Sequence, residues 1–155
     1  IPALLAEHRA GVVLMHGRGE PDRMQENTEY KDLGGEVIAY LKEARDRAVA
    51  AGIAPQDIVV DPGIGFGKSV EGNWDLLELL PRLRAELGHQ ILIGLSRKSF
   101  LTRTFGLPAD RIQVPMAAAH MAALHGGARI LRVHDIIEAK QVARVFELSL
   151  GWGTE

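Results

Sequence analysis

The stretch that decides the fold runs from Ile58 to Lys68 and reads Ile-Val-Val-Asp-Pro-Gly-Ile-Gly-Phe-Gly-Lys. Its first three residues form an apolar run that is too short for a helix and rich in β-branched side chains, which predicts a strand buried on both faces. Asp61 ends this run, and the glycines that follow allow the backbone to approach a flat ligand closely. An acidic residue and a flexible loop after a buried strand indicate a binding site at the carboxyl end of that strand.

Three more apolar runs of the same character predict three more strands, at Val12–Met15, Ile91–Leu95 and Ile130–Val133. Alternation of such strands with helices predicts parallel strands joined by right-handed crossovers. Two folds fit this order, a doubly wound open sheet and a (β/α)₈ barrel of which four units form half. The segments with helical periodicity are Glu36–Ala51, a helix after Asn73 that runs through Leu76, Leu77 and Leu80 towards Gly88, Val114–His125 and Ile136–Leu150.

Local residues predict where two of these helices begin. Asn73 is predicted to cap the helix that runs towards Gly88, and Pro81 inside that segment predicts a kink or a break. Asp135 followed by Glu138 resembles a capping box, which predicts the start of the last helix.

The composition is that of a globular protein with a core of its own. The chain has 155 residues, 46% apolar and 25% charged, and its 18 basic and 20 acidic residues leave a formal charge of −2. Nucleic acid and membrane partners are therefore not expected, and no apolar run approaches the ~18 residues of a membrane span. Cys is absent, which excludes a thiolate nucleophile and fits a reducing, cytoplasmic location. Because residue 1 is Ile, we expect the sequence to be part of a longer chain.

Polar or glycine-rich residues follow all four predicted strands. His16 to Gly19 follow the first run, Ser96 to Ser99 the third, and His134 with Asp135 the fourth. Arg132 is predicted to lie just inside the last strand, and a position within a central strand argues against a purely solvent-facing role. Four such ends on one face of a sheet predict a site for an anionic ligand that forms hydrogen bonds.

The glycine-rich loop does not match the known nucleotide-binding patterns. A phosphate-binding loop needs Gly five positions before Gly67, where this chain has Pro62. The spacing of Gly63, Gly65 and Gly67 also departs from the dinucleotide fingerprint. A buried Asp61 can instead accept two parallel hydrogen bonds from an amidine-like edge such as a 2-aminopyrimidinone, unless it serves as a helix cap or a salt-bridged core acid.

Two roles remain possible for each of the other charged residues at the strand ends. Arg97 and Lys98 bind a phosphate or carboxylate, or form a solvated rim, and His134 donates to a phosphate or caps the next helix. His120 and His125 share no helix face, so a zinc pair is not predicted. His8 and His89 are predicted to lie at the surface. We predict no metal ligand in this chain.

Four segments, in this order and spacing, resemble dihydropteroate synthase from its fifth strand to its C-terminus. They are LMHGRGEPDRMQ (14–25), DPGIGFGKS (61–69), IGLSRKSFL (93–101) and ILRVHD (130–135). The resemblance implies a (β/α)₈ TIM barrel of the pterin-binding type, of which residues 1–155 form the C-terminal four β/α units of one domain. It also implies the condensation of 6-hydroxymethyl-7,8-dihydropterin pyrophosphate with p-aminobenzoate, assisted by Mg²⁺, to give 7,8-dihydropteroate and pyrophosphate.

The resemblance implies a role for each matching residue. Asp61 would hold the polar edge of the pterin, Lys98 its ring carbonyl and N5 side, and Arg132 its ring face. Arg97 and Ser99 would lie near p-aminobenzoate, where sulfonamides compete. The implied catalytic residues are Lys98, Arg132 and His134, with Arg132 and His134 at the pyrophosphate, and the implied pterin pocket is Met15, Asp61, Phe66, Gly94, Lys98 and Arg132.

The family's first four strands have no counterpart in this sequence. In the family they supply further pterin ligands, the Asn that binds Mg²⁺ and two mobile loops, so we expect the chain alone to be inactive and its strand edges to be exposed. The resemblance also implies a homodimer through the C-terminal helices, with 136–150 as a candidate interface. Two alternatives stay open: another pterin-binding barrel such as a methyltetrahydrofolate methyltransferase, against which SRKS argues, and a non-catalytic remnant that binds pterin or a partner chain.

Overall fold

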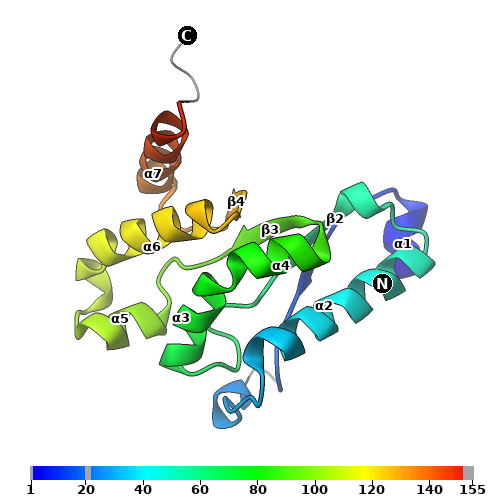
Figure 1. Cartoon of the computed structure of the whole chain (residues 1–155), viewed down its shortest axis with the longest axis horizontal. Helices are drawn as coiled ribbons and strands as arrows, with labels where there is room; N and C mark the ends of the chain where they lie inside the picture. The colour runs from blue at the N-terminus through cyan, green and yellow to red at the C-terminus, as the bar shows by residue number, and fades with distance from the viewer. Residues whose placement is uncertain (1, 20–21, 152–155) are drawn as a thin grey trace.

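The computed structural model describes residues 2–19 and 22–151, which form alternating helices and strands (Figure 1). Two of these helices, α1 and α5, were not predicted from the sequence. The elements are α1 (Pro2–Glu7), β1 (Val12–Met15), α2 (Leu33–Ala50), β2 (Ile58–Asp61), α3 (Val70–Glu78), α4 (Leu80–Leu87), β3 (Gln90–Ile93), α5 (Ser99–Phe105), α6 (Gln113–His125), β4 (Ile130–Leu131) and α7 (Ile136–Ser149).

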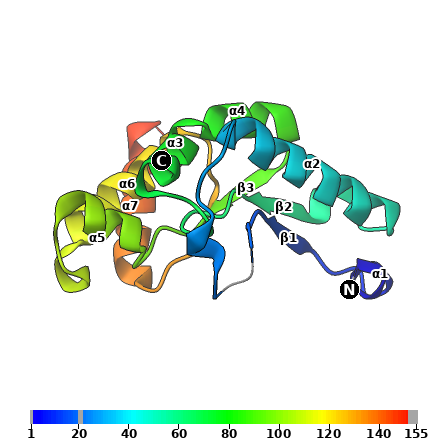
Figure 2. The ribbon, with the colours of Figure 1, turned by 90° about the horizontal axis from the view of Figure 1, so that it is seen from below.

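The four strands form one parallel sheet whose order is the order of the chain, β1-β2-β3-β4. The register pairs Met15 with Asp61 and Ile93 with Leu131, so the carboxyl ends of the strands meet at one edge. A doubly wound sheet reverses its strand order at a switch point, and this sheet does not. Figure 2 shows α2, α3 and α4 on one side of the sheet and the other side open. The arrangement is that of half a (β/α)₈ barrel.

The two faces of the sheet differ in burial. Side chains towards the helices form the core, with Val60, Ile91 and Ile93 at 1% exposure or less. On the opposite face Val13 is 49% exposed and Ile130 37%. The prediction that all four strands are buried on both faces is therefore wrong for β1 and β4, because no described element covers the inner face there. The predicted bounds of the last two strands also change, since β3 ends at Ile93 and β4 at Leu131.

The break at Pro81 is confirmed, because α3 ends at Glu78 and α4 begins at Leu80. The predicted cap of α3 is wrong. Ser69 is the capping residue, accepting a hydrogen bond from the Gly72 amide at 2.9 Å, and Asn73 lies inside the helix. Helix α2 begins at Leu33, before the predicted Glu36, because Asp32 accepts from the Gly35 amide.

The predicted capping box at Asp135 is also wrong. Asp135 occupies the position before α7, but its carboxylate accepts from the Arg97 guanidinium at 3.1 Å instead of from the helix. Helix α7 itself stands out from the body and packs on α6 (Figure 1), where the Phe146 ring lies 5.1 Å from the His125 ring.

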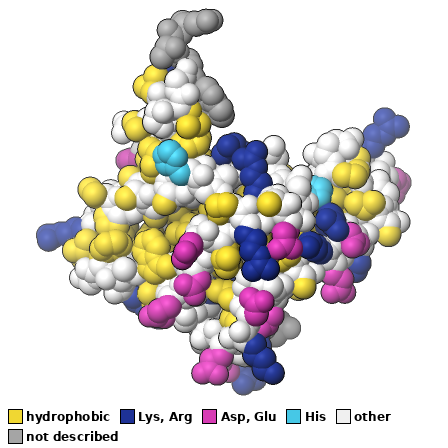
Figure 3. Space-filling model, viewed as in Figure 1, with side chains coloured by type: hydrophobic (Ala, Val, Ile, Leu, Met, Phe, Trp, Pro, Cys, Tyr) yellow, Lys and Arg dark blue, Asp and Glu magenta, His cyan; other side chains and the backbone are white. Residues whose placement is uncertain are grey.

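The surface in the view of Figure 3 divides by side-chain type. Charged side chains of both signs gather over α2 and α4, where Lys42 and Arg82 both pair with Glu86, at 2.7 and 2.9 Å. Apolar side chains gather over α5 and α6 and at the base of α7. Among the described helices, none is both long and apolar enough to cross a membrane.

Candidate active site

The site is built at the edge where the carboxyl ends of the strands meet, and Asp61 lies at its centre. Asp61 is the last residue of β2 and is 3% exposed. Its Oδ1 atom accepts a hydrogen bond from the Gly63 amide at 2.7 Å. Gly63 has a φ of 72°, and a side chain at this position would overlap the backbone carbonyl oxygen of His16. Only glycine fits this turn, which holds the carboxylate against the end of β1.

Three cations act on the Asp61 carboxylate. Burial raises the pKa of Asp61, while the Gly63 amide and the charges of Arg132, Lys98 and Lys68 act in the opposite direction. Burial is also the main cause of the lowered pKa of Lys98; the Arg132 charge lowers it further, and Asp61 opposes both. One buried acid among several cations can accept hydrogen bonds from a neutral ligand edge while the cations hold an anionic part of the same ligand.

The side chains of Lys98 and Arg132 each pack close to the backbone of a glycine. The Lys98 ammonium lies 4.0 Å from the centre of the Phe66 ring. A side chain at Gly65 would come within 3.3 Å of Lys98 Nζ, and one at Gly94 within 2.9 Å of an Arg132 guanidinium nitrogen. Small residues at these two positions therefore make room for the two cations.

The predicted position of Arg132 inside a central strand is wrong. Strand β4 ends one residue earlier, at Leu131, and it lies at the edge of the described sheet. The Arg132 amide still bonds to the Ile93 carbonyl at 2.9 Å, so its backbone continues the ladder. Its side chain is exposed. Arg132 therefore reaches the site from the rim.

The loops after β3 and β4 are linked by two contacts. The backbone amide and Nδ1 of His134 lie 3.2 and 3.0 Å from the Ser96 hydroxyl. The second contact is the ion pair of Arg97 with Asp135. Between the loops is a cavity of about 370 Å³, whose cationic groups suit an anion. It is lined by Gly94, Ser96, Arg97, Lys98, Arg132, Val133 and His134.

Most of the predicted site residues lie at this edge. Met15, 37% exposed, is the register partner of Asp61 and lies on the same edge. Ser99 is the exposed first residue of α5, and it does not line the cavity between the β3 and β4 loops. The residues brought together around Asp61 and the cavity are Phe66, Gly94, Arg97, Lys98, Arg132 and His134.

Four residues support the loop after β2, a role that was not predicted for any of them from the sequence. Lys68 and His16 are buried and lie 3.1 Å apart, Nζ to Nδ1. Asn73 accepts from the Gly65 amide at 2.6 Å, and the Tyr30 hydroxyl donates to the Gly67 carbonyl at 2.9 Å. Lys68 follows a glycine run and precedes the residue that caps α3. This arrangement draws attention to a lysine only in a phosphate-binding loop, a pattern that the chain does not match.

The described residues offer no metal centre, since they contain no group of three or more His, Asp or Glu side chains able to hold an ion. His120 is buried in α6, and burial lowers its pKa. His89 is partly buried, and burial lowers its pKa as well. His8 is exposed, as predicted.

Residues 1–134 match the family described as pterin-binding enzymes. Dihydropteroate synthase of Neisseria meningitidis serogroup B is 42% identical over 151 residues, which are 95% of this chain and 53% of the relative. The structure of the Yersinia pestis enzyme in a sulfonamide drug complex superposes with a TM-score of 0.92 at 33% identity, covering 97% of this chain and 54% of that one.

The Thermus thermophilus dihydropteroate synthase in complex with 4-aminobenzoate gives a TM-score of 0.89 at 39% identity, covering 97% of this chain and 61% of that one. The same protein has also been solved in complex with 6HMPPP. The chain spans about half the length of these relatives.

Proposed function

The chain belongs to the pterin-binding enzyme family, and we propose that residues 1–155 act as the C-terminal half of a dihydropteroate synthase barrel. The reaction joins 6-hydroxymethyl-7,8-dihydropterin pyrophosphate to p-aminobenzoate and releases pyrophosphate. The observation that carries the proposal is the buried Asp61 carboxylate, placed beside Lys98 and Arg132 at the carboxyl edge of the sheet. Similarity to dihydropteroate synthases over nearly the whole chain supports it.

The pterin binds through its polar edge. The Asp61 oxygen atoms have capacity beyond the one Gly63 amide, so they accept hydrogen bonds from the 2-amino group and the adjacent ring N–H. Lys98 moves from its place over Phe66 to the ring carbonyl and N5 side. Arg132 lies against the ring face, and Met15, Phe66 and Gly94 shape the pocket. Burial of Asp61 strengthens these hydrogen bonds because competing water is excluded.

The chemical step is a substitution at the methylene carbon of the pterin. Its bond to oxygen breaks, and the electron pair leaves with the pyrophosphate, whose developing charge Arg132 and His134 stabilise. The electron-rich dihydropterin delocalises the positive charge left on the carbon. The aniline nitrogen of p-aminobenzoate then forms the new C–N bond and releases a proton to water. Positioning and electrostatics provide the catalysis, and no protein nucleophile takes part.

Arg97 and Ser99 serve the second substrate in this proposal. The Arg97 guanidinium is held by Asp135 at the rim of the cavity, where a benzoate carboxylate can compete for it. Ser99 follows Lys98 directly in the chain and is the exposed first residue of α5. We propose that p-aminobenzoate binds beside the pyrophosphate end of the pterin.

Magnesium belongs to the proposal as an assisting ion whose ligand lies outside this chain. The described residues do not fit a Mg²⁺ site, because the one buried carboxylate of the site is bonded to an amide and surrounded by cations. The roles above therefore involve only the chain's own side chains.

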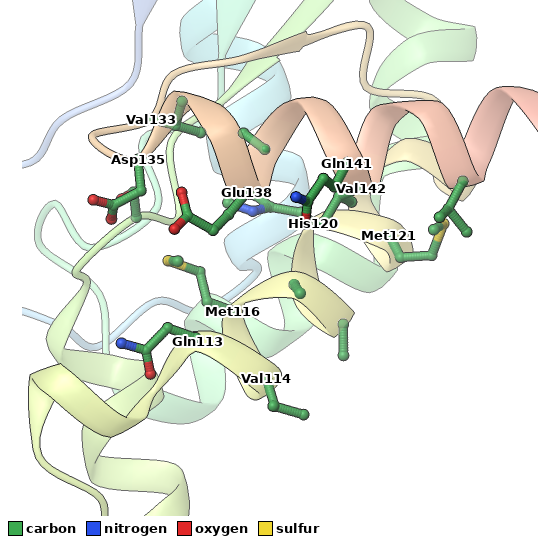
Figure 4. A pocket seen from close by; sticks show the side chains of 15 residues that line it. Gln113, Val114, Met116, His120, Met121, Val133, Asp135, Glu138, Gln141 and Val142 are labelled. Atoms are coloured by element: carbon green, nitrogen blue, oxygen red, sulfur yellow. The ribbon is translucent and has the colours of Figure 1, made fainter.

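We also propose a homodimer through the C-terminal helices and a cytoplasmic location. An apolar groove of about 560 Å³ runs between α6 and α7, and its lining includes Val114, Met116 and Met121 on α6 and Val142 on α7 (Figure 4). Ile136 and Ile137 at the start of α7 are 63% and 73% exposed. Such apolar surface is typical of an interface. Sedimentation of the protein at its full natural length tests the dimer, and a monomer would exclude it.

The decisive experiment measures pyrophosphate release by the protein at its full natural length, with the dihydropterin pyrophosphate and Mg²⁺, in the presence and absence of p-aminobenzoate. We expect release that depends on p-aminobenzoate and is lost in Lys98→Ala. A folded protein that binds the pterin but releases no pyrophosphate would indicate a different pterin-binding barrel or a non-catalytic remnant, and would refute the proposal.

A further inference from the structure

We infer that Lys68 is a positioning residue, which pins the glycine-rich loop after β2 to the end of β1 and thereby holds Asp61 in its ligand-binding conformation. The inference deepens the proposed function and rests on it only in naming a pterin as the ligand. It is carried by the hydrogen bonds and burial of Lys68 and His16.

The Lys68 ammonium makes three hydrogen bonds within the protein. Its Nζ atom lies 2.9 Å from the Gly63 carbonyl oxygen, 2.8 Å from the Phe66 carbonyl oxygen and 3.1 Å from His16 Nδ1. A lysine ammonium has three N–H donors and no acceptor, so these three acceptors use all of them. Lys68 is 3% exposed. It is therefore an internal tether and has no donor left for a phosphate or other ligand.

The two carbonyls that Lys68 binds belong to the part of the loop that shapes the site. Gly63 provides the amide that binds Asp61, and Phe66 provides the ring beneath Lys98. The Phe66 amide also bonds to the Gly63 carbonyl at 3.1 Å, which closes a turn around the ammonium. Loss of the ammonium would leave one buried and one partly buried carbonyl oxygen without this donor. The loop would then adopt other conformations, and the Asp61 carboxylate would lose its fixed direction.

His16 is the acceptor that connects this turn to β1. Because Lys68 can only donate, His16 Nδ1 must present its lone pair, which assigns the neutral ring with hydrogen on Nε2. Burial, followed by the charges of Lys68 and Arg18, lowers the pKa of His16 to about 4, which keeps the ring neutral. The Tyr40 ring packs edge-on at 5.0 Å and holds the imidazole in place.

The remaining anchors of the loop cannot replace Lys68. Asn73 holds the Gly65 amide and Tyr30 holds the Gly67 carbonyl, so both act further along the loop. The His16 amide bonds to the Asp61 carbonyl at 2.9 Å, but this joins the strand ends and not the turn beyond them. Among the described residues, Lys68 is the side chain that joins the turn at Gly63 to β1.

The test uses the protein at its full natural length and four variants. Lys68→Met keeps the length of the side chain and removes its donors, and His16→Leu removes the acceptor. His16→Asn keeps an acceptor near the place of Nδ1 and serves as the conservative rescue. Ile53→Ala is the matched control, because it truncates a core residue, 4% exposed, in the cluster with Ala48 and Ile58 at the other end of the sheet. The measurements are the Kd for 6-hydroxymethyl-7,8-dihydropterin by calorimetry and the amide exchange rate of Gly63.

We expect Lys68→Met and His16→Leu to weaken pterin binding by at least about tenfold and to accelerate Gly63 exchange by a similar factor, since one buried hydrogen bond is worth about that much. His16→Asn should retain more affinity than His16→Leu. Ile53→Ala should lower the melting temperature and leave the Kd unchanged, which separates positioning from general destabilisation.

A folded Lys68→Met protein with native Kd and native Gly63 exchange would overturn the inference. If Lys68→Met does not fold, His16→Leu decides by the same two measurements. If the native protein itself binds no pterin, the proposed function fails, and Gly63 exchange in the variants then decides on its own whether Lys68 holds the loop.

Discussion

Replacement of His16 by asparagine is expected to make the protein less sensitive to acid. The native ring is buried and neutral, and burial together with the charges of Lys68 and Arg18 lowers its pKa from 6.5 to about 4. In the unfolded chain the same ring binds a proton near pH 6.5. Between pH 6.5 and 4 the unfolded state therefore binds more protons than the folded state, so stability falls as the pH falls. Asparagine cannot titrate, and it keeps an acceptor for Lys68.

The size of the effect follows from the two pKa values. The whole difference corresponds to about 3 kcal/mol in the free energy of unfolding. At pH 5 the unfolded ring is almost fully protonated and the native ring is almost neutral. His16 therefore accounts for a loss of about 2 kcal/mol between pH 7 and pH 5. That is a large part of the 5–15 kcal/mol typical of a folded domain.

Urea unfolding of the native protein and His16→Asn at pH 7 and pH 5 measures this loss. His89 and His120 also have pKa values lowered by burial and weaken both proteins at pH 5. The difference in the free energy of unfolding between the two proteins isolates the contribution of His16. Between pH 7 and pH 5 this difference should change in favour of the variant by about 2 kcal/mol. Equal losses in both proteins would show that His16 is not kept neutral and would refute the account of its hydrogen bond with Lys68.

Three further changes test the site. Asp61→Asn should weaken pterin binding by at least about tenfold. It should also raise the melting temperature at pH 7, because burial raises the pKa of Asp61 and so disfavours its ionised form. A lower melting temperature would contradict this. Asn73→Ala should cost about 1–3 kcal/mol in urea unfolding, because the Gly65 amide loses its acceptor; an unchanged midpoint would show that the amide finds another partner. Gly94→Ala should raise the KM for the pterin substrate without changing the melting temperature, because the added methyl displaces only the Arg132 side chain; an unchanged KM would place Arg132 elsewhere during turnover.

The short apolar runs separated by helical segments were sufficient to predict parallel strands that alternate with helices, while the choice of a barrel over a doubly wound sheet came from the resemblance. The sequence was insufficient for the ends of these elements. Asn73 is a good capping residue, yet Ser69 caps α3, which leaves the Asn73 amide to hold the Gly65 loop. Asp135 lies at the start of α7, yet its carboxylate pairs with Arg97, 38 residues away in the chain. In both cases the residue type predicts a hydrogen bond to the start of a helix. The side chain binds a group in a loop instead.

Lys68 shows a different limit. The resemblance and the strand-end rule direct attention to residues that can face a ligand, and Lys68 faces backbone. Two of its three acceptors are carbonyl oxygens, which carry no side-chain signal, and the third belongs to a residue 52 positions earlier. No pattern of residue types identifies such a tether. Only the three-dimensional arrangement shows that all its donors are used.

These contacts divide the site into a rigid part and a mobile part. Asp61 is fixed by the Gly63 amide, and Lys68 in turn holds the Gly63 carbonyl; these groups are buried. Lys98 rests on an aromatic ring and Arg132 is exposed at the rim, so both can move when a ligand arrives. A rigid acid and mobile cations suit a substrate with a planar edge to be recognised and an anion to be released. In the proposed reaction, the buried part would set the orientation of the pterin, while the exposed Arg132 would follow the pyrophosphate as its charge develops and it departs.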